Sequence, residues 1–195
     1  TMTTMTKCLV ALSVSACVWL PVHGDTLVLN PAADTRISQM TGEADVNFEG
    51  QTSTTIHGSP SGGAYAMDSG LFKFDVSSLP SGVVVTSVTF SIYIEAAAGN
   101  AYFNFRELTS DWVSAEATWT LAKTGVPWTT AGGDVSALQL GNVDILTTDI
   151  GKYKTYTSNA DFVAVVQRWI DSPSYNRGII LTSLFGNEYQ FITYT

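Results

Sequence analysis

The sequence has almost no cysteine: of its 195 residues only Cys8 and Cys17 are cysteines, and both lie near the N-terminus. A disulfide framework is therefore excluded for the rest of the chain, so packing, or bound metal ions, must hold the fold together. Histidine is equally rare. Beyond residue 24 only His57 remains, in a segment rich in serine, threonine and glycine, where we expect a solvated loop side chain.

Basic residues are also scarce, because 9 Lys and Arg stand against 17 Asp and Glu and the net charge is −8. A nucleic-acid partner is excluded, since phosphate binding needs a basic footprint. An acidic polysaccharide would need a local basic patch that works against the overall charge. The few charged residues and the many Thr, Ser, Gly and aromatic residues are typical of an extracellular all-β domain.

Catalytic motifs are missing as well. The sequence contains no HExxH, CxxC or phosphate-binding glycine loop, and Pro60 stands where a nucleophile elbow would have its serine. Glu107, Asp111 and Glu116 could pair as the acid and base of a glycosidase, but their spacing does not fix how far apart the carboxylates lie. We therefore predict that the protein is not an enzyme, and keep a hydrolase or lyase as an alternative.

The one long apolar run, residues 8–20, follows a lysine and is too short and wrongly flanked for a typical membrane span. With the small residues that come after it, it predicts a secretion signal of residues 1–24, followed by one domain of residues 25–195. The sequence that ends at Cys17 also resembles a bacterial lipobox, so lipid anchoring at that cysteine is the alternative. We expect a secreted or cell-surface protein of a bacterium or archaeon.

The segment Gly70–Ile94 reads as two strands joined by a turn. Phe72 and Phe74 alternate with polar residues, as do Phe90 and Ile92, which predicts strands with one buried and one wet face. Pro and Gly in between favour a turn, so we predict a central antiparallel hairpin.

The remaining pattern predicts many short strands and one helix. Apolar residues of the segment 159–171 recur with helical spacing, and Ser158 or Asn159 can cap its start. Many short strands with Gly and Pro turns predict an all-β sandwich of two antiparallel sheets. The further strands are expected at residues 26–29, 34–38, 52–57, 102–108, 143–146, 154–157, 178–183 and 188–194.

Tryptophan could stack on sugar rings, but we expect Trp112, Trp119 and Trp128 to plug the end of the sandwich, and Trp169 to lie on the apolar helix face.

The better candidate for a binding site comes from alternation. If the phenylalanines of three successive strands point inward, polar and aromatic side chains share the outward face and can stack on a glycan and bind its carboxylates. The predicted ligand-binding residues are Lys73, Tyr93, Tyr102, Asn104 and Arg106.

Calcium is the one metal that the sequence favours, because oxygen ligands in the loops of a sandwich without disulfides suit this ion. The candidate ligands are Asp34, Asp134 and Asp144, whose spacing matches no EF-hand. Solvated loop acids or turn caps are the alternative interpretation.

Several stretches, in this order, together resemble the DNRLRE (disaggregatase-related) domain family of secreted bacterial and archaeal proteins. They are Ala33-Asp34-Thr35, residues 71–80 (LFKFDVSSLP), Trp112 with Thr118-Trp119, Pro127-Trp128 with Gly132-Gly133-Asp134, and residues 165–169 (VVQRW) followed by 176–181 (NRGIIL). The resemblance implies a jelly-roll β-sandwich and a non-catalytic module, and related domains are classed as carbohydrate-binding modules that act on alginate-like polysaccharides. Members of that family usually continue with one more strand after the stretch that matches residues 190–193.

We therefore predict a secreted, non-catalytic module that binds polysaccharide. If the glycan is acidic, Lys73 and Arg106 would contact its carboxylates, and binding would weaken with salt. The alternative is a structural or adhesive surface protein that self-associates by strand exchange at its C-terminal edge, because an unpaired edge strand invites strand addition.

Overall fold

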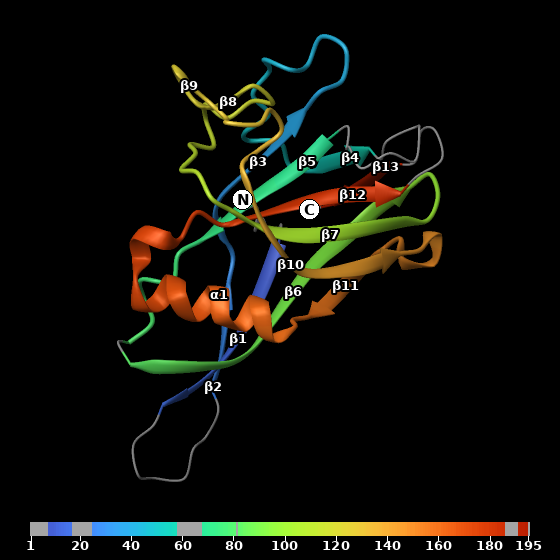
Figure 1. Cartoon of the computed structure of the whole chain (residues 1–195). Helices are drawn as coiled ribbons and strands as arrows, with labels where there is room; N and C mark the ends of the chain where they lie inside the picture. The colour runs from blue at the N-terminus through green and yellow to red at the C-terminus, as the bar shows by residue number, and fades with distance from the viewer. Residues whose placement is uncertain (1–7, 17–24, 58–67, 81, 186–190, 195) are drawn as a thin grey trace, which may run out of the picture.

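The computed structural model describes residues 8–16, 25–57, 68–80, 82–185 and 191–194. The described residues form two large antiparallel sheets, one two-stranded hairpin and one α-helix, which confirms the predicted all-β sandwich (Figure 1). None of the helices in this part of the chain has the length and hydropathy of a membrane span.

The first sheet, sheet B, has five strands in the order β10-β7-β12-β5-β3. All its pairings are antiparallel, and β12 lies at its centre because it pairs with both β5 and β7. The bounds are β3 (Pro31–Ser38), β5 (Asp68–Phe74), β7 (Ala101–Leu108), β10 (Val135–Ile145) and β12 (Ile179–Phe185).

The second sheet, sheet A, is organised around its longest strand, β6, which pairs with β1, β11 and β13. The outer strand β2 pairs with β1, and the outer strand β4 pairs with β13. The bounds are β1 (Cys8–Ala16), β2 (Asp25–Leu29), β4 (Thr54–His57), β6 (Val83–Ala97), β11 (Lys152–Thr157) and β13 (Phe191–Tyr194).

The predicted central hairpin is wrong. Both strands form, but β5 belongs to sheet B and β6 to sheet A, so they do not pair. Their connection carries the chain from one sheet to the other, across a gap of about 10 Å. Alternation of apolar and polar residues predicts a strand with one buried face, but it does not identify the neighbouring strand.

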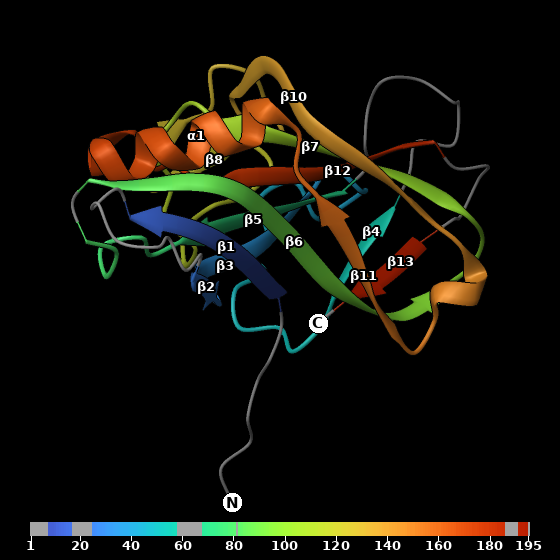
Figure 2. The same ribbon diagram turned by 90° about the horizontal axis from the view of Figure 1, so that it is seen from below.

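The main core lies between the two sheets and is closed by the helix α1 (Ala160–Asp171). Phe90 packs edge to face on Phe72 and Phe105, with ring centroids 5.7 and 5.0 Å apart. The helix begins where the sequence predicts, because the Asn159 side chain accepts a hydrogen bond from the Phe162 backbone N–H. Figure 2 shows α1 lying across β6 and β10. The helix buries Phe162, Val165, Val166 and Trp169, as its apolar spacing predicts.

A second, smaller core covers the outer face of sheet B. The segment 109–134, with the short hairpin of β8 (Leu121–Lys123) and β9 (Val126–Pro127), packs onto Ile37, Leu71, Leu108 and Ile180. Trp112 and Trp128 are buried in this cluster and Trp119 packs against it, so the predicted packing role of all three is confirmed. Their predicted place is wrong, because they cover the outer face of sheet B and do not plug the end of the sandwich.

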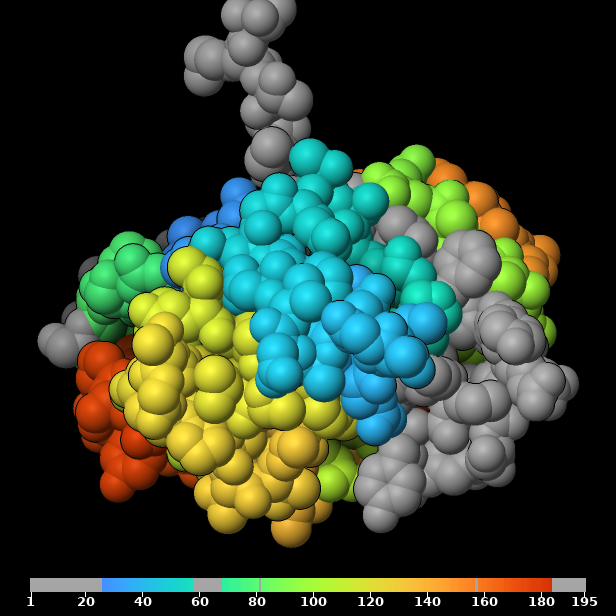
Figure 3. All heavy atoms as spheres, turned by 90° about the horizontal axis from the view of Figure 1, so that it is seen from above, coloured from blue at the N-terminus to red at the C-terminus, as the bar shows by residue number. Residues whose placement is uncertain are grey.

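The segment 39–53 joins this cover from the other side. Figure 3 shows it, in blue and cyan, lying against the yellow segment 109–134. The Asn47 amide donates hydrogen bonds of 2.6 and 2.7 Å to the carbonyl oxygens of Ser114 and Ala117. Two loops far apart in the sequence thereby form one layer over sheet B.

Residues of the predicted secretion signal take part in the fold. Cys8–Ala16 form β1, which lies between β2 and β6 and pairs with both (Figure 2). Cys17 and the predicted cleavage site lie outside the described residues, and the secretion signal and the domain boundary at residue 25 stay predictions.

Candidate functional site

A cleft of mixed polar and apolar lining opens where β5 ends beside the segment that follows the helix. It has a volume of about 630 Å³, and we call it the Lys73 cleft. One wall comes from the end of β5 and the turn after it, and the other from residues 173–177, which include the 3-10 turn η2 (Pro173–Tyr175). Its lining includes Lys73, Asp75, Ser77, Asp111, Asn176 and Arg177.

The chain can approach Lys73 closely because residue 178 is a glycine. Gly178 has a φ of +80°, and a Cβ placed on it would lie 2.0 Å from the backbone oxygen of Phe72 and 3.0 Å from Cα of Lys73. No side chain fits there, so the backbone that carries Asn176 and Arg177 passes directly beside β5. The Asn176 amide completes this wall by donating a hydrogen bond of 2.7 Å to the Phe74 carbonyl.

Two cations and two carboxylates line the Lys73 cleft. The Lys73 ammonium lies 4.0 Å from an exposed carboxylate oxygen of Asp111, which makes a weak ion pair. The hydroxyl and backbone N–H of Ser77 hold the pKa of Asp75 below its usual value, with a backbone bond of 2.8 Å. Opposite charges therefore lie side by side in this cleft.

Two polar atoms of this wall have no hydrogen-bond partner among the described residues. They are the buried Asn176 Oδ1 and the buried Arg177 Nε. Buried polar atoms are usually paired, so such atoms beside a cleft mark a place where water or a ligand group completes the bonding. The Arg177 guanidinium also makes no ion pair within the described part of the chain.

The predicted glycan platform is only partly assembled. Its premise, that the three strands share one sheet, is wrong, because Tyr93 lies on β6 in sheet A while the other four residues lie in sheet B. Asn104 is only 2% exposed and cannot reach a polymer at the surface. Tyr102 and Arg106 are half-buried on the outer face of β7.

Lys73 stands apart from the β7 residues. β12 runs between β5 and β7, so Lys73 and Arg106 are separated by two strand spacings, about 10 Å across the sheet. Between them, Ile180 lies under the second core. Lys73 therefore belongs to a different surface from Arg106, and its neighbour in the cleft is Arg177, which sequence reasoning missed.

The three predicted calcium ligands do not come together. Asp34 lies on β3 and Asp144 on β10, at opposite edges of the five-stranded sheet B. Asp134 precedes β10 and accepts hydrogen bonds from Ser110 and from the backbone of Thr129 and Thr130. Among the residues that the structure describes, no three His, Cys, Asp or Glu side chains form a metal-binding group. Asp134 therefore fits the alternative interpretation of a turn cap.

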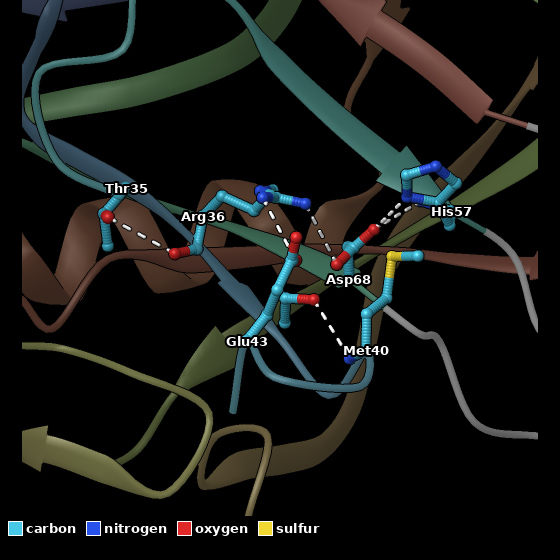
Figure 4. Close-up of polar contacts among 7 residues, drawn as sticks. Thr35, Arg36, Met40, Glu43, His57 and Asp68 are labelled. Atoms are coloured by element: carbon cyan, nitrogen blue, oxygen red, sulfur yellow. Dashed lines mark hydrogen bonds and ion pairs between the residues drawn. The ribbon is translucent and has the colours of Figure 1, made fainter. Parts of the chain in front are cut away.

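A second hollow, of about 440 Å³, lies at the far end of β3, next to a buried charge cluster (Figure 4). Asp68 is fully buried, and its carboxylate contacts the Arg36 guanidinium at 3.3 Å and His57 Nδ1. Arg36 also contacts Glu43 at 3.2 Å and stacks over the Phe48 ring, 3.8 Å from its centroid. We call Arg36, Glu43, His57 and Asp68 the Arg36 cluster.

The Arg36 cluster joins the two sheets. His57 ends β4 in sheet A, whereas Arg36 and Asp68 lie on β3 and β5 in sheet B. The His57 backbone N–H also donates to Asp68, over 3.1 Å. Arg36 Nε and Glu43 Oε2 have no hydrogen-bond partner among the described residues. Because two carboxylates already pair with the charge of the guanidinium, this cluster is nevertheless better suited to hold the sandwich end together than to bind an anionic ligand. The expected solvated loop histidine is therefore wrong: His57 is tied to a buried carboxylate.

A comparison with known families agrees with a binding role. A model of carbohydrate-binding module family 96 matches residues 25–132, which is more than half of the chain. The chain belongs to carbohydrate-binding module family 96. A search of curated proteins found no match.

The family 96 match supports carbohydrate binding, which the DNRLRE resemblance also implies, while membership of the DNRLRE family stays a prediction. The matched residues include one wall of the cleft, with Lys73, Asp75 and Asp111. The other wall, with Asn176 and Arg177, lies beyond the match. A family of binding modules points away from catalysis and is compatible with a secreted protein.

Proposed function

We propose that this chain is a secreted, non-catalytic module that binds a polysaccharide in the Lys73 cleft. Membership of family 96 supports the proposal that the ligand is a carbohydrate. The Lys73 cleft is the proposed binding site because cations, carboxylates and hydroxyls lie together there at an accessible place. The proposed residues are Lys73, Asp75, Asp111, Asn176 and Arg177.

A uronate-containing glycan uses all of these groups. Its carboxylate can take the ammonium of Lys73 and the guanidinium of Arg177, which binds carboxylates with two parallel hydrogen bonds. Asp75 and Asp111 can accept hydrogen bonds from sugar hydroxyls. Phe74, the one aromatic residue of the lining, is only 3% exposed, so the cleft recognises its ligand by hydrogen bonds and charge rather than by stacking.

The experiment is affinity gel electrophoresis against acidic polymers (alginate, polygalacturonate) and neutral polymers (hydroxyethyl cellulose, barley β-glucan). We expect retardation by an acidic polymer, and a loss of at least tenfold in affinity in the double variant Lys73→Gln, Arg177→Gln. Binding should weaken as salt rises from 50 to 500 mM, because the contacts are between partly exposed charges.

The matched control is Arg106→Gln, which removes a cation from the outer face of β7, outside the cleft. It should bind like the parent protein. Loss of binding in Arg106→Gln with retention in the double variant would move the site to β7. Retardation by no polymer would contradict the binding proposal, and release of new reducing or unsaturated ends would contradict a non-catalytic module.

A further inference from the structure

Along one edge of the longest strand, β6, segments from the C-terminal half of the chain form hydrogen bonds with its backbone groups over almost its whole length. β11 pairs with the stretch from Thr89 to Ile94. Ser158 bonds to both backbone groups of Val88. Beyond it, the Gln167 amide of the helix accepts from the Val85 N–H at 2.8 Å and donates to the Val83 carbonyl at 3.0 Å.

The other edge of β6 is divided between two strands. β13 pairs with it at Ile94, Ala96 and Ala97. β1 pairs with it from Val83 to Ile92. Within the described residues, β1 is the only segment that covers this longer stretch, which we call the β6 edge.

β13 and β1 lie end to end along β6 and run in the same direction. Both are antiparallel to β6; Tyr194 is opposite Ile94, and Cys8 is opposite Ile92. One β6 residue separates the two pairings. A strand that continues the line of β13 therefore enters the place that β1 holds.

The occupant of this place is connected to the domain through the predicted cleavage site. If the chain is cut before residue 25, β1 is no longer covalently joined to the domain, and β1 is the one strand that pairs with β2 among the residues that the structure describes. The β6 edge also borders the main core, since Val85, Val88 and Phe90 are buried in it. A bare edge here would expose backbone groups and open the core from the side.

We propose that the β6 edge is an acceptor site for one extended apolar peptide strand that runs in line with β13. Cys8–Ala16 is its occupant in the uncut chain. After cleavage the same segment stays bound, by the pairing of backbone groups that is known as β-augmentation, and it can be replaced only by a strand of the same direction. This site is independent of glycan binding in the Lys73 cleft.

The test uses the full chain with a specific protease site placed within residues 17–24. The chain is folded, cut, and incubated with a labelled peptide of residues 8–16 in which Cys8→Ser prevents oxidation. We expect the cut leader strand to co-elute with the domain in gel filtration, and the labelled peptide to replace it. The matched control peptide carries Ala11→Pro. Ala11 is opposite Thr89, the neighbour of Val88, and backbone groups alternate between the two edges of a strand, so this change removes a backbone N–H that faces β6 and should weaken binding at least tenfold.

Hydrogen exchange of the β6 amides gives an independent readout. The amides that face β1, those of Ser87, Thr89 and Ser91, should be protected while a strand is bound and should exchange at least tenfold faster when it is released. The amides of Val85 and Val88 bond to Gln167 and Ser158 on the opposite edge and serve as the internal control. Protection that persists after release, or equal binding of the proline peptide, would overturn the proposal. A cut protein that excludes the peptide and dimerises while the amides that face β1 stay protected would show a second copy as the occupant instead.

A second variant tests the direction of the strand. In it, the sequence of Cys8–Ala16 follows Thr195 directly and the N-terminal segment 1–24 is absent. The register leaves one residue between β13 and the acceptor site, so this strand should protect the β6 amides as β1 does. Fast exchange in a folded variant would overturn the in-line placement.

Discussion

At the scale of single residues, Asp134 shows how one carboxylate fixes a loop. Its oxygens accept hydrogen bonds of 2.7 Å from Ser110 Oγ, 3.1 Å from the Thr129 N–H and 2.9 Å from the Thr130 N–H. Desolvation raises the pKa of Asp134, but these hydrogen bonds together outweigh it, so the pKa lies below its usual value. The ionised form is thus favoured in the folded state.

This gives a pH-dependent prediction for Asp134→Asn. A depressed pKa means that the stabilisation is present above the unfolded-state pKa, about 3.9, and is lost as the pH falls through the folded-state pKa. The variant should lose about 1 kcal/mol in the free energy of unfolding at pH 7, and the difference should narrow below about pH 4. Urea unfolding at several pH values measures it. Asp144→Asn, at an exposed position of β10, is the control, and equal losses at pH 7 and pH 3 would contradict the prediction.

The sequence predicts some residues of the site and not others, for a physical reason. Lys73 follows from alternation, because it stands between two inward phenylalanines of one strand. Arg177 does not, because its place beside Lys73 depends on a loop geometry that periodicity does not contain. His57 and Asp68 are separated by ten residues and belong to different sheets, so no local pattern could pair them.

At the scale of elements, strand and helix positions follow from the sequence, but their partners do not. α1 begins and ends close to its predicted bounds because capping, spacing and the following proline agree. The β8–β9 hairpin was not predicted, since its strands are too short to show alternation. β10 is longer than predicted. Its first half is irregular, with register shifts against β7, so the sequence pattern does not show it as a strand.

The backbone at Gly178, just before β12, passes very close to β5, and this close approach leads to a prediction for Gly178→Ala. This change adds a Cβ that would lie 2.0 Å from the Phe72 carbonyl oxygen, in a backbone conformation with φ +80°. We expect a loss of more than about 3 kcal/mol in the free energy of unfolding, because the left-handed conformation and the clash add up. The matched control is Gly151→Ala: its φ is +78° but nothing lies within 4 Å of the added atom, so about 1 kcal/mol is expected. Equal losses in urea unfolding would show that the close approach contributes nothing.

At the scale of the whole molecule, the two large sheets are assembled from distant segments. Of the neighbouring strands in sheets A and B, only β1 and β2 follow each other directly in the chain. β12 joins β5 to β7, and β13 joins β4 to β6, so both sheets depend on the C-terminal part of the chain. The sequence predicts two sheets, but this interleaving follows only from the three-dimensional structure.

The interleaving predicts slow folding that depends on the C-terminal strands. Non-local pairing delays the transition state, so refolding from urea should take milliseconds to seconds, as in other β-sandwiches. A chain that stops at residue 178 lacks the central strand of sheet B and should show no cooperative unfolding transition by circular dichroism. A chain that stops at residue 190 keeps that strand and should unfold cooperatively at a lower temperature. Cooperative unfolding of the shorter chain would contradict this dependence.

The dependence on β12 and β13 bears on how such a chain is synthesised. A ribosome releases the N-terminal strands first, yet β12 and β13, which join β5 to β7 and β4 to β6, are made last. Neither sheet of the nascent chain can therefore be completed until synthesis is nearly finished. An unfolded chain is what a narrow protein-conducting pore admits, so if the chain is secreted, as proposed above, this order of strands would delay folding until after the passage.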